Sequence, residues 1–151
     1  MTTPKEIFKK KLEEKGDKSL LDAKYIGVSA DEIIDCYNEM GLKSPITLIE
    51  NTWLKNWYSN GLPMSTNGWG NGYVRVCEGH PFYGKEYDDI PVDVHRGLTY
   101  SNYNESDGKY FTEGYWVGFD TAHYGDTLYK WPEDAVYHEA LYLFKQIYNV
   151  E

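Results

Sequence analysis

The chain has 151 residues, enough for one compact domain with a buried core, and a net charge of −9 at neutral pH. This balance excludes a broad nucleic-acid footprint, because such binding needs many basic side chains against phosphates and the only arginines are Arg75 and Arg96. We find no signal peptide or membrane-spanning segment and expect a soluble protein whose cysteines, Cys36 and Cys77, are reduced and buried.

The first forty residues predict two helices with clear boundaries. Residues 3–6 combine an N-cap threonine, a proline at the first helical position and the glutamate of a capping box, and Gly16 ends this helix. A second capping box at residues 29–32 opens another helix, which Gly41 closes.

A third helix is expected from Ser44 to about Asn60. Its basis is the helical spacing of four apolar side chains, Ile46, Ile49, Trp53 and Trp57. Composition then changes, because eleven of the 14 glycines lie between Gly61 and Gly125. The stretch 67–72 cannot be helical, and we expect a mobile or tightly turned loop there.

Strands are expected at 73–77, 92–100 and 115–119, with a polar hairpin loop at 102–109 joining the last two. A final helix begins at Trp131 and Pro132 and carries two apolar stripes. The stripes consist of Val136, Ala140, Leu143 and Ile147, and of Tyr137, Leu141, Phe144 and Tyr148. A helix apolar on two sides is either well buried or shared with another subunit, and we predict a homo-oligomer.

This order of elements predicts an α+β fold in a single domain, residues 1–151. N-terminal helices occupy residues 1–60, and residues 72–151 form a core with a small antiparallel sheet and a C-terminal helix. No internal repeat interrupts this organisation.

Residues able to do chemistry are concentrated between Gly72 and Asp126, a run with three of the four histidines and both arginines. Asp120, His123 and Asp126 follow one another at intervals of three, which places them on one side of a turn or short helix. With His80 and His95 they could ligate a divalent metal, but no metal-binding signature is present, and we predict neither a metal nor another cofactor.

Acid–base hydrolysis is a second possible chemistry of this run. His95 and His123 could exchange protons with a phosphoester while Arg96 faces the developing phosphate charge. For an enzyme, the predicted catalytic residues are His80, His95, His123 and Asp120. Ser101, Thr99 and Cys77 could serve as nucleophiles, but none lies in a recognised nucleophile motif.

Binding without chemistry is the third possibility. A nucleotide needs aromatic faces for its base, arginine for its phosphates and carboxylates for its ribose. The predicted ligand-binding residues are Tyr73, Arg75, His80, Tyr83, Tyr87, Asp88, His95, Arg96, Tyr100, Asp120 and His123. Each has a purely structural alternative, such as an aromatic in the core or Arg96 paired with Asp93, but for the run as a whole we favour a function.

The motifs of this run form a distinctive series. They are His80-Pro81, Tyr83-Gly84, Tyr87-Asp88, Val94-His95, Gly97-Leu98-Thr99-Tyr100-Ser101, Gly118-Phe119-Asp120, Ala122-His123 and Gly125-Asp126. The series resembles an uncharacterised family of small bacteriophage and prophage proteins, over residues 72–147. Where that family has a second glycine after the histidine, this chain has Arg96.

The resemblance implies a phage protein acting in the cytoplasm of the bacterial host. By analogy with phage proteins that counter host defence, our leading hypothesis is an anti-defence protein that sequesters a small nucleotide immune signal, a cyclic dinucleotide or an ADP-ribose derivative. The alternative is a hydrolase or phosphodiesterase that cleaves such a nucleotide, and a second alternative is an acidic inhibitor of a host defence protein. The expected partner is a small nucleotide, with no polymeric nucleic acid and no membrane.

Overall fold

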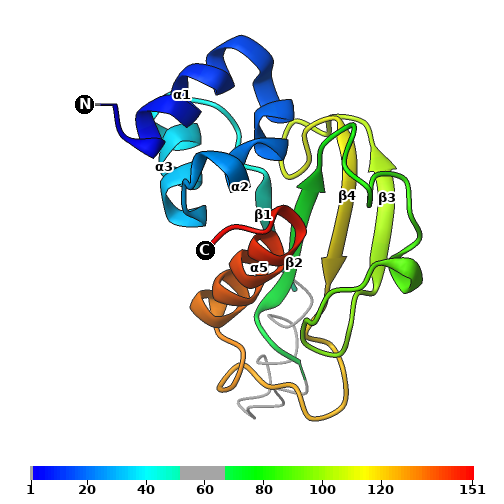
Figure 1. The fold of residues 1–151 in the computed structure, drawn as a ribbon. Coiled ribbons are helices and arrows are strands. Elements are labelled where there is room, and N and C mark those ends of the chain that lie inside the picture. The colour runs from blue at the N-terminus through cyan, green and yellow to red at the C-terminus, as the bar shows by residue number, and fades with distance from the viewer. Residues whose placement is uncertain (1, 52–66) are drawn as a thin grey trace.

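A four-stranded antiparallel sheet with strand order β1-β2-β4-β3 organises the molecule, and helix α5 crosses one of its faces (Figure 1). The computed structural model describes residues 2–51 and 67–151. The helices are α1 (Pro4–Lys15), η1 (Gly16–Leu21), α2 (Ala23–Ile26), α3 (Ala30–Glu39), η3 (Tyr87–Asp89) and α5 (Glu133–Tyr148). The strands are β1 (Ile46–Glu50), β2 (Gly70–Val76), β3 (Tyr100–Asn104) and β4 (Gly114–Phe119). The predicted α+β fold is therefore confirmed.

Local capping defines the N-terminal helices as predicted. The Thr3 hydroxyl accepts from the backbone of Glu6, and Ser29 and Glu32 form a reciprocal capping box at the start of α3. Gly16 ends α1 with a φ of 65°, a left-handed conformation that glycine adopts without strain. These helices gather beside β1 and close one side of the core (Figure 1).

The register of the sheet separates two faces. Val74 and Val76 of β2 lie opposite Val117 and Tyr115 of β4, and these four side chains are buried in the main core. The alternate residues of the same strands point to the other face, where Trp116 is fully buried.

The predicted helix from Ser44 is wrong where the structure describes it, because Ile46–Glu50 forms β1. Ile46 lies opposite Val74, so its side chain joins the core through strand alternation. The helical spacing of apolar residues led to the wrong prediction. Pairing with β2 supplies the backbone hydrogen bonds of this segment in an extended conformation. Trp53 and Trp57 lie outside the described residues.

The expected loop at 67–72 is also corrected, since β2 begins at Gly70. Glycine is required within this strand by close packing. A Cβ on Gly72 would lie 2.7 Å from Cε1 of Phe119 and 3.0 Å from Cβ of Ala140 on α5. The glycines thus permit a close sheet–helix contact rather than a turn.

The predicted strand at 92–100 is wrong except at its last residue, because β3 spans Tyr100–Asn104. Arg96 and Gly97 have φ angles of 61° and 78°, which are incompatible with an extended strand. The β3–β4 hairpin is confirmed, but its loop starts after Asn104 and not at Asn102.

Both apolar stripes of α5 are covered within the chain. Seven of their eight members are buried, namely Val136, Ala140, Leu141, Leu143, Phe144, Ile147 and Tyr148. Burial against the chain's own sheet and helices accounts for this pattern, so the predicted homo-oligomer remains a prediction without this support.

Cys36 and Cys77 are buried free thiols, as expected. In the described part of the chain, no helix combines the length and apolar character needed to cross a membrane.

Candidate functional site

Three separate segments meet near the C-terminal end of β4. They are the turn at His95 and Arg96, the residue Asp120 just after β4, and the turn from His123 to Asp126. We call His95, Arg96, Asp120, His123 and Asp126 the His95 cluster. The cluster contains four of the predicted site residues, together with Asp126.

Asp126 is the fixed centre of the cluster. Its side chain is buried, with Oδ1 2.7 Å from Nε2 of His95 and Oδ2 accepting from the backbone N–H of His123 at 2.9 Å. The backbone N–H of Asp126 donates to the His123 carbonyl at 2.9 Å. Both carboxylate oxygens therefore have defined partners, and the turn cannot change shape without breaking them.

His95 is held from three directions. Its backbone N–H donates to Oε2 of Glu139 on α5 at 2.7 Å, and its ring lies against Trp131 with centroids 4.2 Å apart. Asp126 accepts from Nε2–H, so the neutral imidazole presents Nδ1 as a hydrogen-bond acceptor. No group among the described residues hydrogen-bonds this nitrogen.

His123 is the second imidazole of the cluster, with its ring centroid 6.3 Å from that of His95. Its Nδ1 lies 2.9 Å from Oδ1 of Asp120 and 3.8 Å from Oδ2 of Asp126, close enough for ion pairs but not aligned for a hydrogen bond. Asp120 also accepts from the backbone N–H of Ala122 at 3.0 Å. Asp120 therefore shapes the turn and places a carboxylate beside the second histidine.

Arg96 stands at the exposed edge of the cluster. Its φ of 61° lies in the region that favours glycine, and a non-glycine residue there carries of the order of 1 kcal/mol of strain. The Nη2 group donates to the Tyr124 carbonyl at 3.0 Å, which joins the two turns. The remaining N–H groups of this exposed guanidinium can donate to a ligand.

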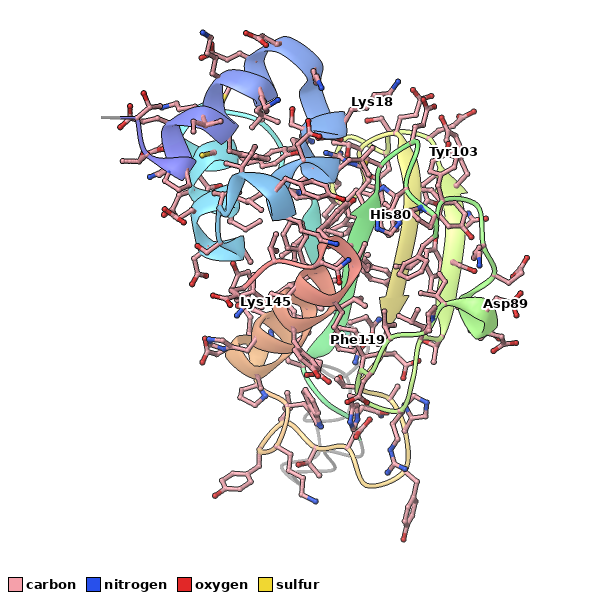
Figure 2. All side chains as sticks on the ribbon, viewed as in Figure 1. Lys18, His80, Asp89, Tyr103, Phe119 and Lys145 are labelled. Carbon is pink, nitrogen blue, oxygen red and sulfur yellow. The ribbon has the colours of Figure 1, made fainter. Side chains whose placement is uncertain are left out.

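His80 lies outside the cluster, and its predicted role as a catalytic or ligand-binding residue stays a prediction. Its Nδ1 accepts from the backbone N–H of Phe82 at 2.9 Å, and its Nε2 lies 2.6 Å from the Ile147 carbonyl. Burial lowers the pKa of this imidazole, with a smaller opposing effect of the Ile147 carbonyl. His80 and Phe119 lie toward opposite ends of the sheet in Figure 2, and Asp120 directly follows Phe119.

Two of the predicted aromatic residues, Tyr73 and Tyr100, pack against other rings within the fold. The rings of Tyr73 and Tyr100 pack edge to face at 5.2 Å, and Phe111 contacts Tyr73 at the same distance. Burial raises the pKa of Tyr73. Tyr87 and Asp88 belong to η3, where Asp88 is exposed.

Arg75 and Tyr83 lie at the other end of the sheet, where both line a cavity. Eight of the residues predicted to bind one nucleotide are thus divided among three places, the His95 cluster, the aromatic face and this cavity, and the other three, His80, Tyr87 and Asp88, lie outside all of them. Sequence spacing alone could not reveal the division, because it depends on the register of β2 and β4.

The candidate nucleophiles are not part of the cluster. The Ser101 hydroxyl accepts from the backbone N–H of Tyr87 at 3.0 Å, and burial raises the pKa of the Cys77 thiol to about 11. Within residues 2–51 and 67–151, no group of three or more His, Cys, Asp or Glu side chains is arranged to hold a metal ion. The arrangement favours proton transfer over covalent chemistry.

Two residues near the cluster were not identified from the sequence. Trp131 was assigned only to a helix start, yet its ring contacts His95. Tyr124 lies between His123 and Gly125, and its side chain is 98% exposed. An aromatic residue inside a His- and Asp-rich motif was a usable signal for Tyr124, whereas the contact of Trp131 is set by the tertiary fold.

Comparison with protein-family models, with curated protein sequences and with solved structures finds no match for this chain.

Proposed function

We propose that the His95 cluster binds a small phosphorylated nucleotide and hydrolyses a phosphoester bond in it. The observation that carries this proposal is the pair formed by buried Asp126 and His95. It fixes the imidazole and leaves Nδ1 as the acceptor, on a ring whose centroid lies 6.3 Å from that of His123 and which precedes the exposed Arg96 in the same turn. A base oriented by a carboxylate is the usual arrangement for abstracting a proton from water or an alcohol.

The proposed reaction needs no covalent intermediate. Nδ1 of His95 takes a proton from water as the water oxygen bonds to phosphorus, and His123 donates a proton to the departing oxygen as the phosphorus–oxygen bond breaks. Arg96 donates to the phosphoryl oxygens, on which negative charge increases in the transition state. Asp126 orients the His95 imidazole, and Asp120 places a carboxylate beside His123.

A small nucleotide is the substrate class that suits the chain best. The net charge of −9 and the two arginines disfavour long nucleic acids, whereas one arginine and two histidines suffice for a single phosphate group. The resemblance to phage proteins supports an anti-defence role, with a cyclic dinucleotide or an ADP-ribose derivative as the immune signal removed.

The test is incubation of the protein with these nucleotides, followed by heat denaturation and chromatography. Wild-type protein should yield hydrolysis products, and His95→Ala should yield none. His138→Ala is the matched control, because His138 is an exposed histidine on α5 outside the cluster. Full turnover by His95→Ala, or recovery of only intact nucleotide with folded wild-type protein, would exclude the hydrolytic role.

Sequestration without cleavage is the second candidate, favoured by Tyr124. The exposed Tyr124 ring offers a stacking face for a nucleobase in the turn to which the Arg96 guanidinium is hydrogen-bonded. A sequestering protein gives heat on isothermal titration and releases intact nucleotide after denaturation. The absence of heat with every cyclic dinucleotide and ADP-ribose derivative would exclude this role.

A further inference from the structure

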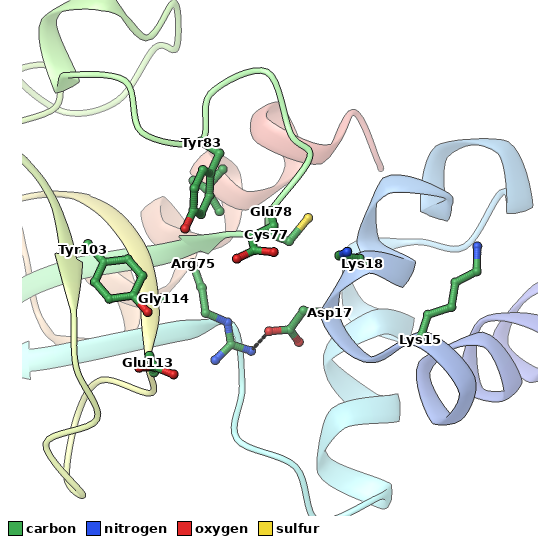
Figure 3. A pocket seen from close by; sticks show the side chains of 11 residues that line it. Lys15, Asp17, Lys18, Arg75, Cys77, Glu78, Tyr83, Tyr103, Glu113 and Gly114 are labelled. Carbon is green, nitrogen blue, oxygen red and sulfur yellow. Dashed lines mark ion pairs between the residues drawn. The ribbon is translucent and has the colours of Figure 1, made fainter.

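A cavity of about 240 Å³ lies at the opposite end of the sheet from the His95 cluster. It is enclosed by η1, the C-terminal end of β2, the loop that follows β2, and the start of β4 (Figure 3). We call it the Arg75 cavity. Because Val76 pairs with Tyr115 at this end and Gly72 pairs with Phe119 at the other, the two sites are separated by the length of the paired strands.

The Arg75 guanidinium is the most unusual group of this cavity. Its side chain is only 8% exposed, and Nη2 lies 2.5 Å from Oδ2 of Asp17. Nη1 donates to the Thr112 hydroxyl, whereas Nε is buried and has no hydrogen-bond partner in the described part of the chain. A buried donor without a partner is costly, so the chain alone does not fully satisfy this guanidinium.

The walls of the cavity carry complementary groups. Lys15, Lys18 and Asp17 come from the helical side, whereas Glu78, Tyr83, Tyr103 and Glu113 come from the loop after β2 and from the hairpin (Figure 3). Tyr103 is half exposed, so its ring is accessible from the cavity mouth. The cavity therefore has two lysines on one side and aromatic faces on the other, and it also contains three carboxylates, of which Asp17 is already paired with Arg75.

We propose that the Arg75 cavity is a second binding site, for a nucleoside monophosphate. The phosphate is held on the helical side by Lys18 and the Arg75 guanidinium, the base lies against Tyr83 and Tyr103, and Glu113 accepts from a ribose hydroxyl or a base amino group. A volume of about 240 Å³ suits one mononucleotide better than a dinucleotide. This inference does not depend on the proposed hydrolysis, because the two sites share no residue.

The test is isothermal titration of the whole protein with AMP, GMP, CMP and UMP, with adenosine and inorganic phosphate as partial probes. At least one monophosphate should bind, and it should bind more tightly than either partial probe. Lys18→Ala should weaken binding roughly five- to tenfold, because it removes one charge-assisted contact to phosphate. Tyr103→Ala should weaken it by a similar factor, because the base loses a stacking face.

Two control variants separate this site from the His95 cluster. Lys10→Ala removes the same charge from an exposed position on α1 and should leave binding unchanged. His95→Ala should also leave it unchanged, while abolishing any nucleotide hydrolysis. The proposal is overturned if no monophosphate binds folded wild-type protein, if Lys18→Ala and Tyr103→Ala both bind normally, or if His95→Ala alone removes binding.

Discussion

At the level of single residues, the buried carboxylate of Asp126 fixes both the ring of His95 and the backbone of His123. In Asp126→Asn the amide can take two orientations. If its N–H₂ group faces Nε2, the His95 proton is forced onto Nδ1. If the amide is flipped, its N–H₂ group faces the His123 N–H, so two donors oppose each other. The first arrangement removes the acceptor nitrogen of His95, and the second keeps it but breaks the hydrogen bond that holds the His123 turn. We expect hydrolysis to slow by roughly 10²- to 10⁴-fold, measured as initial rates on the nucleotide that wild type cleaves.

The matched control for this prediction is Asp89→Asn, an exposed aspartate of η3 that should keep wild-type rates. Circular dichroism must show that Asp126→Asn remains folded. An Asp126→Asn variant with wild-type rates would show that the carboxylate stabilises the turn at His123 but has no part in hydrolysis.

His80 makes stability depend on pH. Burial lowers its pKa below the ordinary value of 6.5, so between these two pKa values the unfolded chain binds more protons than the native one. The contribution of neutral His80 to the free energy of unfolding is therefore fully present above pH 6.5. It is lost as the pH falls toward the lower pKa of His80 in the native protein. Protonation of Nδ1 also removes the acceptor for Phe82.

We expect His80→Asn to be less stable than wild type at pH 8 but to lose less stability between pH 7.5 and pH 5. The asparagine oxygen can still accept from Phe82, and the titrating group is gone. Urea unfolding at each pH measures the difference. Parallel pH profiles for the two proteins would show that His80 does not titrate differently in the folded state.

The His95 cluster was only partly predictable from sequence. The intervals of three among Asp120, His123 and Asp126 correctly indicated one turn, because that contact is local. The approach of His95 depends on a turn that the sequence analysis had assigned to a strand. His80 was included because it shares the same run, yet its partners lie at the C-terminal end of α5.

At the level of elements, the same division between local and distant contacts holds. The boundaries of α1 and α3 follow from side chains that cap their own backbone, which a sequence displays directly. β1 exists because β2 supplies its hydrogen bonds, and residues 51–69 separate the two strands in the sequence. The short sequence of β1 fits the apolar spacing of a helix as well as that of a strand. Its pairing with β2 therefore determines that it forms a strand.

Gly118 in β4 shows how closely the outer face of the sheet is packed. A Cβ there would lie 2.4 Å from Cδ1 of Tyr73 and 2.6 Å from the Gly72 carbonyl oxygen, and the backbone atom cannot move away without breaking the sheet. We expect Gly118→Ala to lower the free energy of unfolding by about 1–3 kcal/mol, measured by urea denaturation.

Asn102→Ala is the comparison for this variant, since Asn102 is an exposed residue on the same face of β3. It should change the free energy of unfolding far less than Gly118→Ala does. Equal stability of Gly118→Ala and wild type would show that Tyr73 can move aside without cost.

At the level of the whole molecule, one ion pair ties the helical segment to the sheet. Asp17 of η1 accepts from the Tyr37 hydroxyl through Oδ1, at 2.5 Å, and binds the Arg75 guanidinium of β2 through Oδ2. Arg75 in turn lies 5.5 Å from the centroid of the fully buried Trp116. The sequence analysis assigned Arg75 to a phosphate because the partner aspartate lies in a distant helical segment.

Removal of that aspartate tests how strongly the two parts of the molecule are joined. Asp17→Ala leaves the buried guanidinium without a counter-ion and the Tyr37 hydroxyl without its acceptor. Breaking a fully buried pair costs about 3–5 kcal/mol, and because the Asp17 side chain is one-third exposed we expect a loss of roughly 2–3 kcal/mol. Urea unfolding followed by tryptophan fluorescence measures it, with exposed Asp88→Ala expected to match wild type. If Asp17→Ala were as stable as wild type, apolar packing between the helices and the sheet would be sufficient to join them, and the pair would serve the Arg75 cavity instead.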